Sequence, residues 1–140
     1  MDNISFVNKT DLEIIDWAKV APWLVSLCET YGFKAGEISY LFCDDDYLLE
    51  INKQYLNHDT LTDIITFDYT YGKTVSADVL ISLERVKDNA VGFEVSYNQE
   101  LARVMAHGVL HCMGLKDKSD SDIKAMRLAE EKAIQMLENQ

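Results

Sequence analysis

The sequence predicts an α+β fold in which a mixed four-stranded sheet packs against helices. Segments with a strand pattern all end by Ser82, whereas long helical patterns dominate the rest of the chain. The 140 residues are 48% hydrophobic, which is enough to bury a sizeable core. Because the chain shows no repeats, linkers or low-complexity segments, we expect residues 1–140 to form one domain.

Four short segments have the composition or the alternation of β-strands. They are residues 4–7, 37–43, 63–69 and 76–82. The last two are expected to pair as a hairpin, because Tyr71 and Gly72 provide a turn between them.

The other segments predict helices. Thr10 is expected to cap a helix that runs toward Gly32 and that Pro22 interrupts. Asp44, Asp45 and Asp46 open a second helix through Tyr55; we interpret them as capping and dipole partners rather than as a metal cluster. Three more helices are expected over residues 83–91, 96–113 and 119–137, with Ser119 or Asp120 as the cap of the last one and Asp122 in its first turn.

Two of the three histidines, His107 and His111, stand one helical turn apart. Residues at this spacing share a helix face, so both imidazoles can bind one Zn²⁺. Gly114 can then end the helix and turn Asp117 toward the metal. This pattern predicts one Zn²⁺ per chain, held by His107, His111 and Asp117, with a position open for water. The alternative is a pair of core histidines hydrogen-bonded to backbone or carboxylate groups.

The helix around these histidines is otherwise almost entirely apolar. Glu100, Arg103, His107 and His111 fall within an arc of roughly 80° on it. Arg103 is therefore a candidate contact for a substrate phosphate, or a structural partner of the site. Two other candidates for the third ligand remain open, Asp120 and His58.

Gly108 follows the first histidine, where metalloproteases of the H-E-x-x-H type have their general base. This argues against a zincin-like peptidase. The spacing H-x-x-x-H-x-x-G-x-x-D still predicts a zincin-like metal helix, and such a site can activate water against a phosphodiester.

These residues resemble the YbeY endoribonucleases, or rRNA maturation factors, whose signature is H-G-x-L-H-L-x-G-Y-D-H. Residues 62–67 (TDIITF) resemble the family's T-D-V-L-S-F strand, residues 77–82 (ADVLIS) its G-D-I-x-I-S strand, and the resemblance covers roughly residues 48–118. The signature itself is matched by His107, Gly108, Leu110, His111 and Gly114.

The resemblance implies a metal-dependent, single-strand-specific endoribonuclease that acts in ribosome biogenesis. Its implied roles are maturation of the 3′ end of 16S rRNA and quality control of ribosomes. The implied partners are single-stranded RNA and the small ribosomal subunit.

The chain departs from the family's pattern at two places. Asp117 stands where the family has its third histidine, with Lys116 in place of the preceding aspartate. Leu56 stands where the family has an arginine associated with RNA cleavage. His58, in the neighbouring loop, is a candidate proton donor or phosphate contact in its place, because histidine titrates near neutrality; the alternative is an ordinary surface histidine.

The net charge of −11 argues against strong non-specific binding to RNA. Any RNA path must therefore be a local basic groove, and the acidic surface suits basic ribosomal proteins. A non-catalytic ribosome assembly factor with a structural zinc is accordingly a second hypothesis. The candidates for the groove are Arg85, Lys87, Arg103, Lys116 and Lys118.

Three cysteines without C-x-x-C spacing indicate reduced, buried thiols. No run of 18 apolar residues and no signal-peptide pattern occurs, so a cytoplasmic protein without membrane association is expected.

Overall fold

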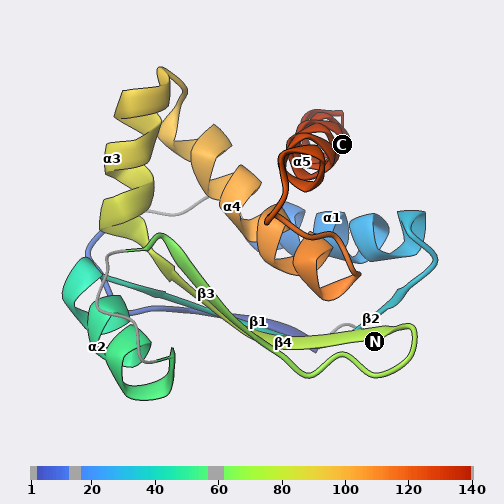
Figure 1. Ribbon diagram of the computed structural model, residues 1–140, viewed down its shortest axis with the longest axis horizontal. Helices are drawn as coiled ribbons and strands as arrows, with labels where there is room; N and C mark the ends of the chain where they lie inside the picture. Colours follow the sequence, from blue (N-terminus) through green and yellow to red (C-terminus); the bar gives the residue numbers. More distant parts are fainter. Residues whose placement is uncertain (1–2, 13–16, 57–61, 140) are drawn as a thin grey trace.

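The computed structural model describes residues 3–12, 17–56 and 62–139. Its elements follow the order β-α-β-α-β-β-α-α-α and form one four-stranded sheet with helices on both faces (Figure 1). The strands are β1 (Asn3–Asn8), β2 (Lys34–Cys43), β3 (Ile64–Asp68) and β4 (Thr74–Ser82). The helices are α1 (Trp17–Thr30), α2 (Asp45–Leu56), α3 (Leu83–Phe93), α4 (Tyr97–Cys112) and α5 (Asp120–Glu138).

The sheet has the strand order β1-β2-β4-β3. β1 and β4 both run parallel to β2, whereas β3 pairs antiparallel with β4 and forms one edge. The predicted α+β class, the mixed sheet and the hairpin are therefore confirmed. β3 is therefore an edge strand, and α4 packs against it at Gly108.

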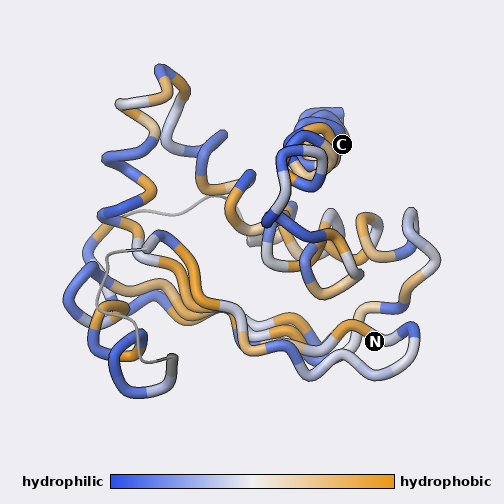
Figure 2. Tube along the Cα trace, viewed as in Figure 1, coloured by the Kyte–Doolittle hydropathy of each residue, from blue (hydrophilic) through white to orange (hydrophobic). Residues whose placement is uncertain are grey.

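The strands alternate between two hydrophobic clusters, as a period of two requires. Tyr40 and Val79 point to the main core with α1, α4 and α5, whereas Leu80 and Cys43 pack with Leu48 of α2 on the opposite face. Apolar residues accordingly run along the strands and recur on the helices that cover them (Figure 2).

Two buried hydrogen bonds tie the helical layer together. The Tyr40 hydroxyl donates to the Met105 carbonyl of α4 at 2.9 Å, and the Trp23 indole donates to the Ala133 carbonyl of α5 at 2.7 Å. Each aromatic side chain is at most 1% exposed, so these bonds satisfy polar groups that would otherwise be buried without partners. They fix α4 against the sheet and α5 against α1.

The predicted start of the first helix is wrong. Thr10 lies in a bend, where its hydroxyl accepts a hydrogen bond from the Leu12 amide at 3.1 Å and donates to the side chain of Asn8 at 2.8 Å. A threonine that bonds so locally stabilises a turn in competition with a helix. Helix α1 begins at Trp17, and it continues through Pro22 rather than splitting there.

The caps of α2 and α5 follow the sequence prediction. Asp44 accepts a hydrogen bond from the Tyr47 amide at the start of α2. Ser96 caps α4, and Ser119 forms a capping box with Asp122 at the start of α5. These caps set where α4 and α5 begin, and thereby which of their residues face each other.

Candidate active site

A cleft of about 360 Å³ lies where α4 meets the edge strand β3, the segment after α4, and α5. It collects residues from four parts of the chain that are far apart in sequence. Its lining consists of Thr62, Asp63, Ile64, Thr66, Arg103, His107, His111, Asp117 and Arg127. Four of the five predicted site residues, His107, His111, Asp117 and Arg103, therefore share one cavity.

The histidines reach this cleft because α4 is buried on every other side. From Glu100 to Met113, all residues are buried except Arg103, His107 and His111. Gly114 has a φ of +105°, a value that L-residues rarely adopt, and the chain turns there. The turn brings Asp117 to the cleft, as the sequence predicted.

Glu130, a buried glutamate of α5, forms a hydrogen bond with His107. Glu130 is 1% exposed, and its Oε2 lies 2.7 Å from Nδ1 of His107. Its Oε1 accepts hydrogen bonds from Arg103 and Arg127, each at 3.1 Å. Burial alone would raise the pKa of the Glu130 carboxyl, but the hydrogen bond from His107 and the charge and hydrogen bond of Arg103 outweigh it and lower the pKa.

The sequence analysis missed Glu130. A signal was present, because Glu130 shares the apolar face of α5 with Met126, Ala133 and Ile134, all buried. A carboxylate on such a face needs a buried partner. The identity of that partner depends on how α5 packs against α4, which the spacing along one helix does not reveal.

Glu130 determines which nitrogen of His107 is free. An ionised carboxylate only accepts hydrogen bonds, so the proton of a neutral His107 lies on Nδ1 and the lone pair on Nε2. Nε2 faces Asp117, whose Oδ2 is 3.5 Å away. This separation is longer than a direct charge-assisted hydrogen bond.

The donor set fits a cation. Two tetrahedral ligands at about 2.0–2.2 Å from one Zn²⁺ lie about 3.3–3.6 Å apart, which includes the separation of His107 Nε2 from Asp117 Oδ2. A carboxylate behind the ligating histidine is also the usual support of such a ligand. Within residues 3–12, 17–56 and 62–139, however, no group of three or more His, Cys, Asp or Glu side chains is already arranged to hold a metal ion.

Arg103 forms ion pairs with several carboxylates. Its guanidinium donates to Glu100 at 2.7 and 2.9 Å and to Glu130 at 3.1 Å, and it lies 3.8 Å from Asp63. Burial would lower the pKa of Arg103, but the hydrogen bonds and charges of Glu100 and Glu130 raise it, so Arg103 stays charged. Of the two roles expected for Arg103, the structure shows the structural one; a phosphate contact stays a prediction.

Gly108 faces the sheet at close range. A Cβ at this position would lie 3.2 Å from Val79 Cγ1 and 3.3 Å from Ile64 Cδ1. Glycine here lets α4 approach β3 and β4, and any larger residue would require the side chains of Val79 and Ile64 to shift.

The remaining candidates are placed elsewhere. Arg85 pairs with Asp45 at 2.8 Å, and Lys87 lines a different cleft near β1 and α2. Asp120 is the first residue of α5 and is exposed. His58 lies outside the described residues.

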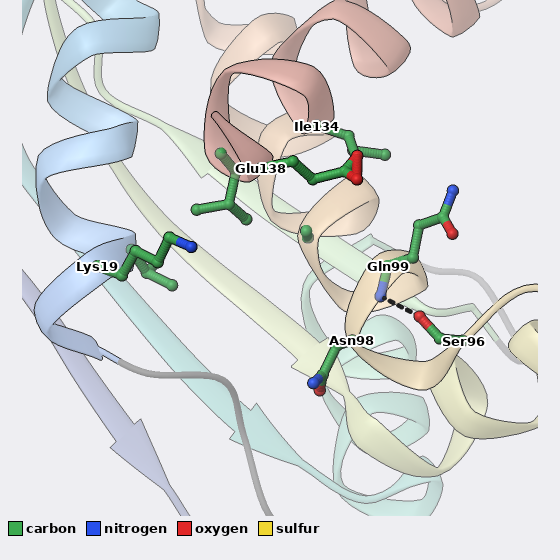
Figure 3. A pocket seen from close by; sticks show the side chains of 9 residues that line it. Lys19, Ser96, Asn98, Gln99, Ile134 and Glu138 are labelled. Carbon is green, nitrogen blue, oxygen red and sulfur yellow. Dashed lines mark hydrogen bonds between the residues drawn. The ribbon is translucent and has the colours of Figure 1, made fainter. Parts of the chain in front are cut away.

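A second cleft, of about 350 Å³, lies between α1, the start of α4 and the end of α5 (Figure 3). Lys19 and Glu138 enter it from α1 and α5, while the Ser96 hydroxyl accepts a hydrogen bond from the Gln99 amide as the cap of α4. Its lining contains no histidine or cysteine among the described residues. The cleft at His107 is therefore the candidate active site.

The model of the family described as Endoribonuclease YbeY matches residues 3–138. The chain belongs to this family. The YbeY relatives include an "Endoribonuclease YbeY" of Flavobacterium johnsoniae, 50% identical over 95% of this chain and 96% of the relative. Another, from Porphyromonas gingivalis, is 53% identical over 84% of this chain and 78% of the relative. The predicted family membership is confirmed.

A solved structure has a similar fold. The chain is similar to a Thermotoga maritima protein whose solution structure has a TM-score of 0.67, with 21% identity over 96% of this chain and 88% of that one. This likeness supports the fold. None of the described helices is both long enough and apolar enough to cross a membrane.

Proposed function

We propose that this protein is a metal-dependent endoribonuclease that cleaves single-stranded RNA at the cleft of His107. The observation that carries the proposal is the arrangement of His107: Nδ1 bonds Glu130 at 2.7 Å, and Nε2 lies 3.5 Å from Asp117 in a cleft that His111 also lines. The names of the YbeY relatives support RNA as the substrate.

In this proposal His107, His111 and Asp117 hold one Zn²⁺. A bound Zn²⁺ supplies charge stabilisation for a phosphodiester and lowers the pKa of a bound water. Glu130 orients the His107 ring and keeps its proton on Nδ1, so that Nε2 remains a donor to the cation.

The ion pairs that Arg103 forms with Glu100 and Glu130 keep the His107 ring in this orientation. Glu100 and Glu130 are each 2% exposed or less, and Arg103 between them donates hydrogen bonds to both and offsets part of their charge. A charge buried without such a partner would be costly, so the three side chains hold one another in place. The carboxylate that orients the His107 ring is therefore itself held in a fixed position.

The proposal extends to rRNA because the sequence resembles the rRNA maturation factors. Maturation of the 3′ end of 16S rRNA, ribosome quality control and binding to the small subunit belong to this extension. The peptidase alternative loses support, because Gly108 is packed against Val79 and Ile64 where a zincin-type base would have to stand.

Elemental analysis tests the metal site. We expect about one zinc per chain in wild type and a loss of it in His107→Ala, His111→Ala and Asp117→Ala. Asp120→Ala is the matched control, because Asp120 is an exposed aspartate three residues beyond Asp117. Full zinc occupancy in Asp117→Ala, together with a loss in Asp120→Ala, would transfer the third ligand to Asp120.

A further inference from the structure

Two arginines line the cleft, and their surroundings differ. The Arg103 side chain is 17% exposed and has three carboxylates within 3.8 Å. The Arg127 side chain, from α5, is 52% exposed. Of the two arginines in the cleft, Arg127 is the more exposed to solvent.

Arg127 is also anchored. Its Nη1 donates to Oε1 of Glu130 at 3.1 Å, one helical turn further along α5, and among the described residues Glu130 is its one hydrogen-bond partner. A guanidinium has several N–H donors, so one bond to the base of the cleft fixes its position and leaves others for a ligand. Glu130 also accepts hydrogen bonds from His107 and Arg103, so Arg127 is one of three described partners of this carboxylate.

We propose that Arg127 binds a backbone phosphate of the RNA strand beside the metal ligands. The inference rests on the proposed function, and it assigns the substrate contact to a residue of α5. Arginine suits this role because its planar donors match phosphate oxygens in pairs. In a chain of net charge −11, an exposed cation inside the cleft is the local attraction that an RNA strand requires.

The contact should not depend on base sequence, since phosphates carry no sequence information. Arg127→Gln should therefore weaken the binding of two unrelated single-stranded RNAs by a similar, several-fold factor. Fluorescence anisotropy of labelled strands measures this, in the cold and with strand integrity checked afterwards.

The salt dependence of binding gives the decisive readout. Each phosphate contact with a single strand contributes about 0.7 to the slope of log K against log salt concentration. We expect Arg127→Gln to reduce the slope by about this amount and Arg127→Lys to keep most of it, because lysine retains the charge. The matched control is Lys132→Gln, an exposed cation on α5 outside the cleft lining, which should keep the wild-type slope.

A wild-type slope in Arg127→Gln, or an equal loss in Lys132→Gln, would overturn the assignment. Thermal unfolding of each variant separates binding from folding; should Arg127→Gln unfold, Arg127→Met, which keeps an alkyl side chain without the charge, is compared with Lys132→Gln in its place and should lose the same part of the slope. If RNA fails to bind wild type at all, the proposed function falls. If wild type binds and Arg127→Gln binds equally well, the function stands and the inference about Arg127 fails.

Discussion

The described part of the chain contains two clusters in which an arginine bonds buried or half-buried carboxylates, and only one of them includes a histidine. At the junction of α2 and α3, Arg85 donates to Asp45 at 2.8 Å, and the Ser82 hydroxyl donates to the same carboxylate at 2.7 Å. Between α4 and α5, Arg103 bonds Glu130, which also bonds His107. The side chains of the first cluster also cap helix backbones, whereas the second cluster holds the imidazole of His107, which lines a cleft.

The comparison shows why a group of acids is a poor guide to a site. In the cluster of Arg85, the Ser82 oxygen accepts from the Arg85 amide, and Glu84 accepts from the Asp45 amide. These bonds begin two helices. Asp45 and Glu84 also line a cleft, but no histidine or cysteine is among its described lining residues. In the cluster of Arg103, the network leaves Nε2 of His107 available.

The largest expected difference is in stability. Glu130→Ala removes a carboxylate that three side chains share in a buried position, and we expect a loss of about 3–5 kcal/mol in the free energy of unfolding. Asp45→Ala is the matched change in the other cluster and should lose about 1–2 kcal/mol, because the Asp45 side chain is 19% exposed. Urea unfolding measures both, and equal losses would remove the distinction between the clusters.

The next effect concerns metal affinity. Glu130→Gln keeps the volume of the side chain but no longer ensures that the His107 proton lies on Nδ1. We expect zinc affinity to fall about 10–100-fold, as for other carboxylates behind a ligating histidine. Competition with a chromogenic chelator measures this. Asp45→Asn should leave the affinity unchanged; a similar drop in Asp45→Asn would mean that the effect is a general loss of charge.

The substitution with the smallest expected effect is Asp45→Asn acting on Cys43, beside the cluster of Arg85. Burial, helped by the charges of Asp44 and Asp45, raises the pKa of its thiol from 9.0 to about 12. The folded state therefore favours the neutral thiol; this contribution to stability is complete below pH 9.0 and is lost as the pH rises toward 12.

At pH 9 the folded protein should have about one Cys43 in a thousand as thiolate, against about half in the unfolded chain. Alkylation at Cys43, followed by peptide mass spectrometry, should be correspondingly slow in native protein. Asp45→Asn should change the rate little, since burial is the larger cause. A large acceleration in that variant would instead make the cluster's charge the main cause.

Sequence reasoning found what lies along one helix. The spacing of His107 and His111 placed both on one face, and Gly114 correctly indicated the turn that brings Asp117 to the cleft. Alternation of apolar residues likewise predicted the strands. These signals are local, so the sequence contains them directly.

What it missed depends on the packing of separate elements. Glu130 and Arg127 reach the cleft only because α5 packs on α4, and nothing near His107 in sequence indicates that contact. Thr10 shows the opposite failure: its local pattern resembled a helix cap, but its hydroxyl bonds Leu12 within a bend.

The central claim, that the cleft of His107 cleaves RNA, has one most direct test. Metal-loaded wild type and His107→Ala are incubated with single-stranded RNA, and the products are resolved on a gel. We predict cleavage by wild type that chelator stops and zinc restores, with only background cleavage by His107→Ala. If metal-loaded wild type cleaves no more RNA than His107→Ala does while it still binds ribosomal subunits, the claim is contradicted, and the protein is an assembly factor with a structural metal.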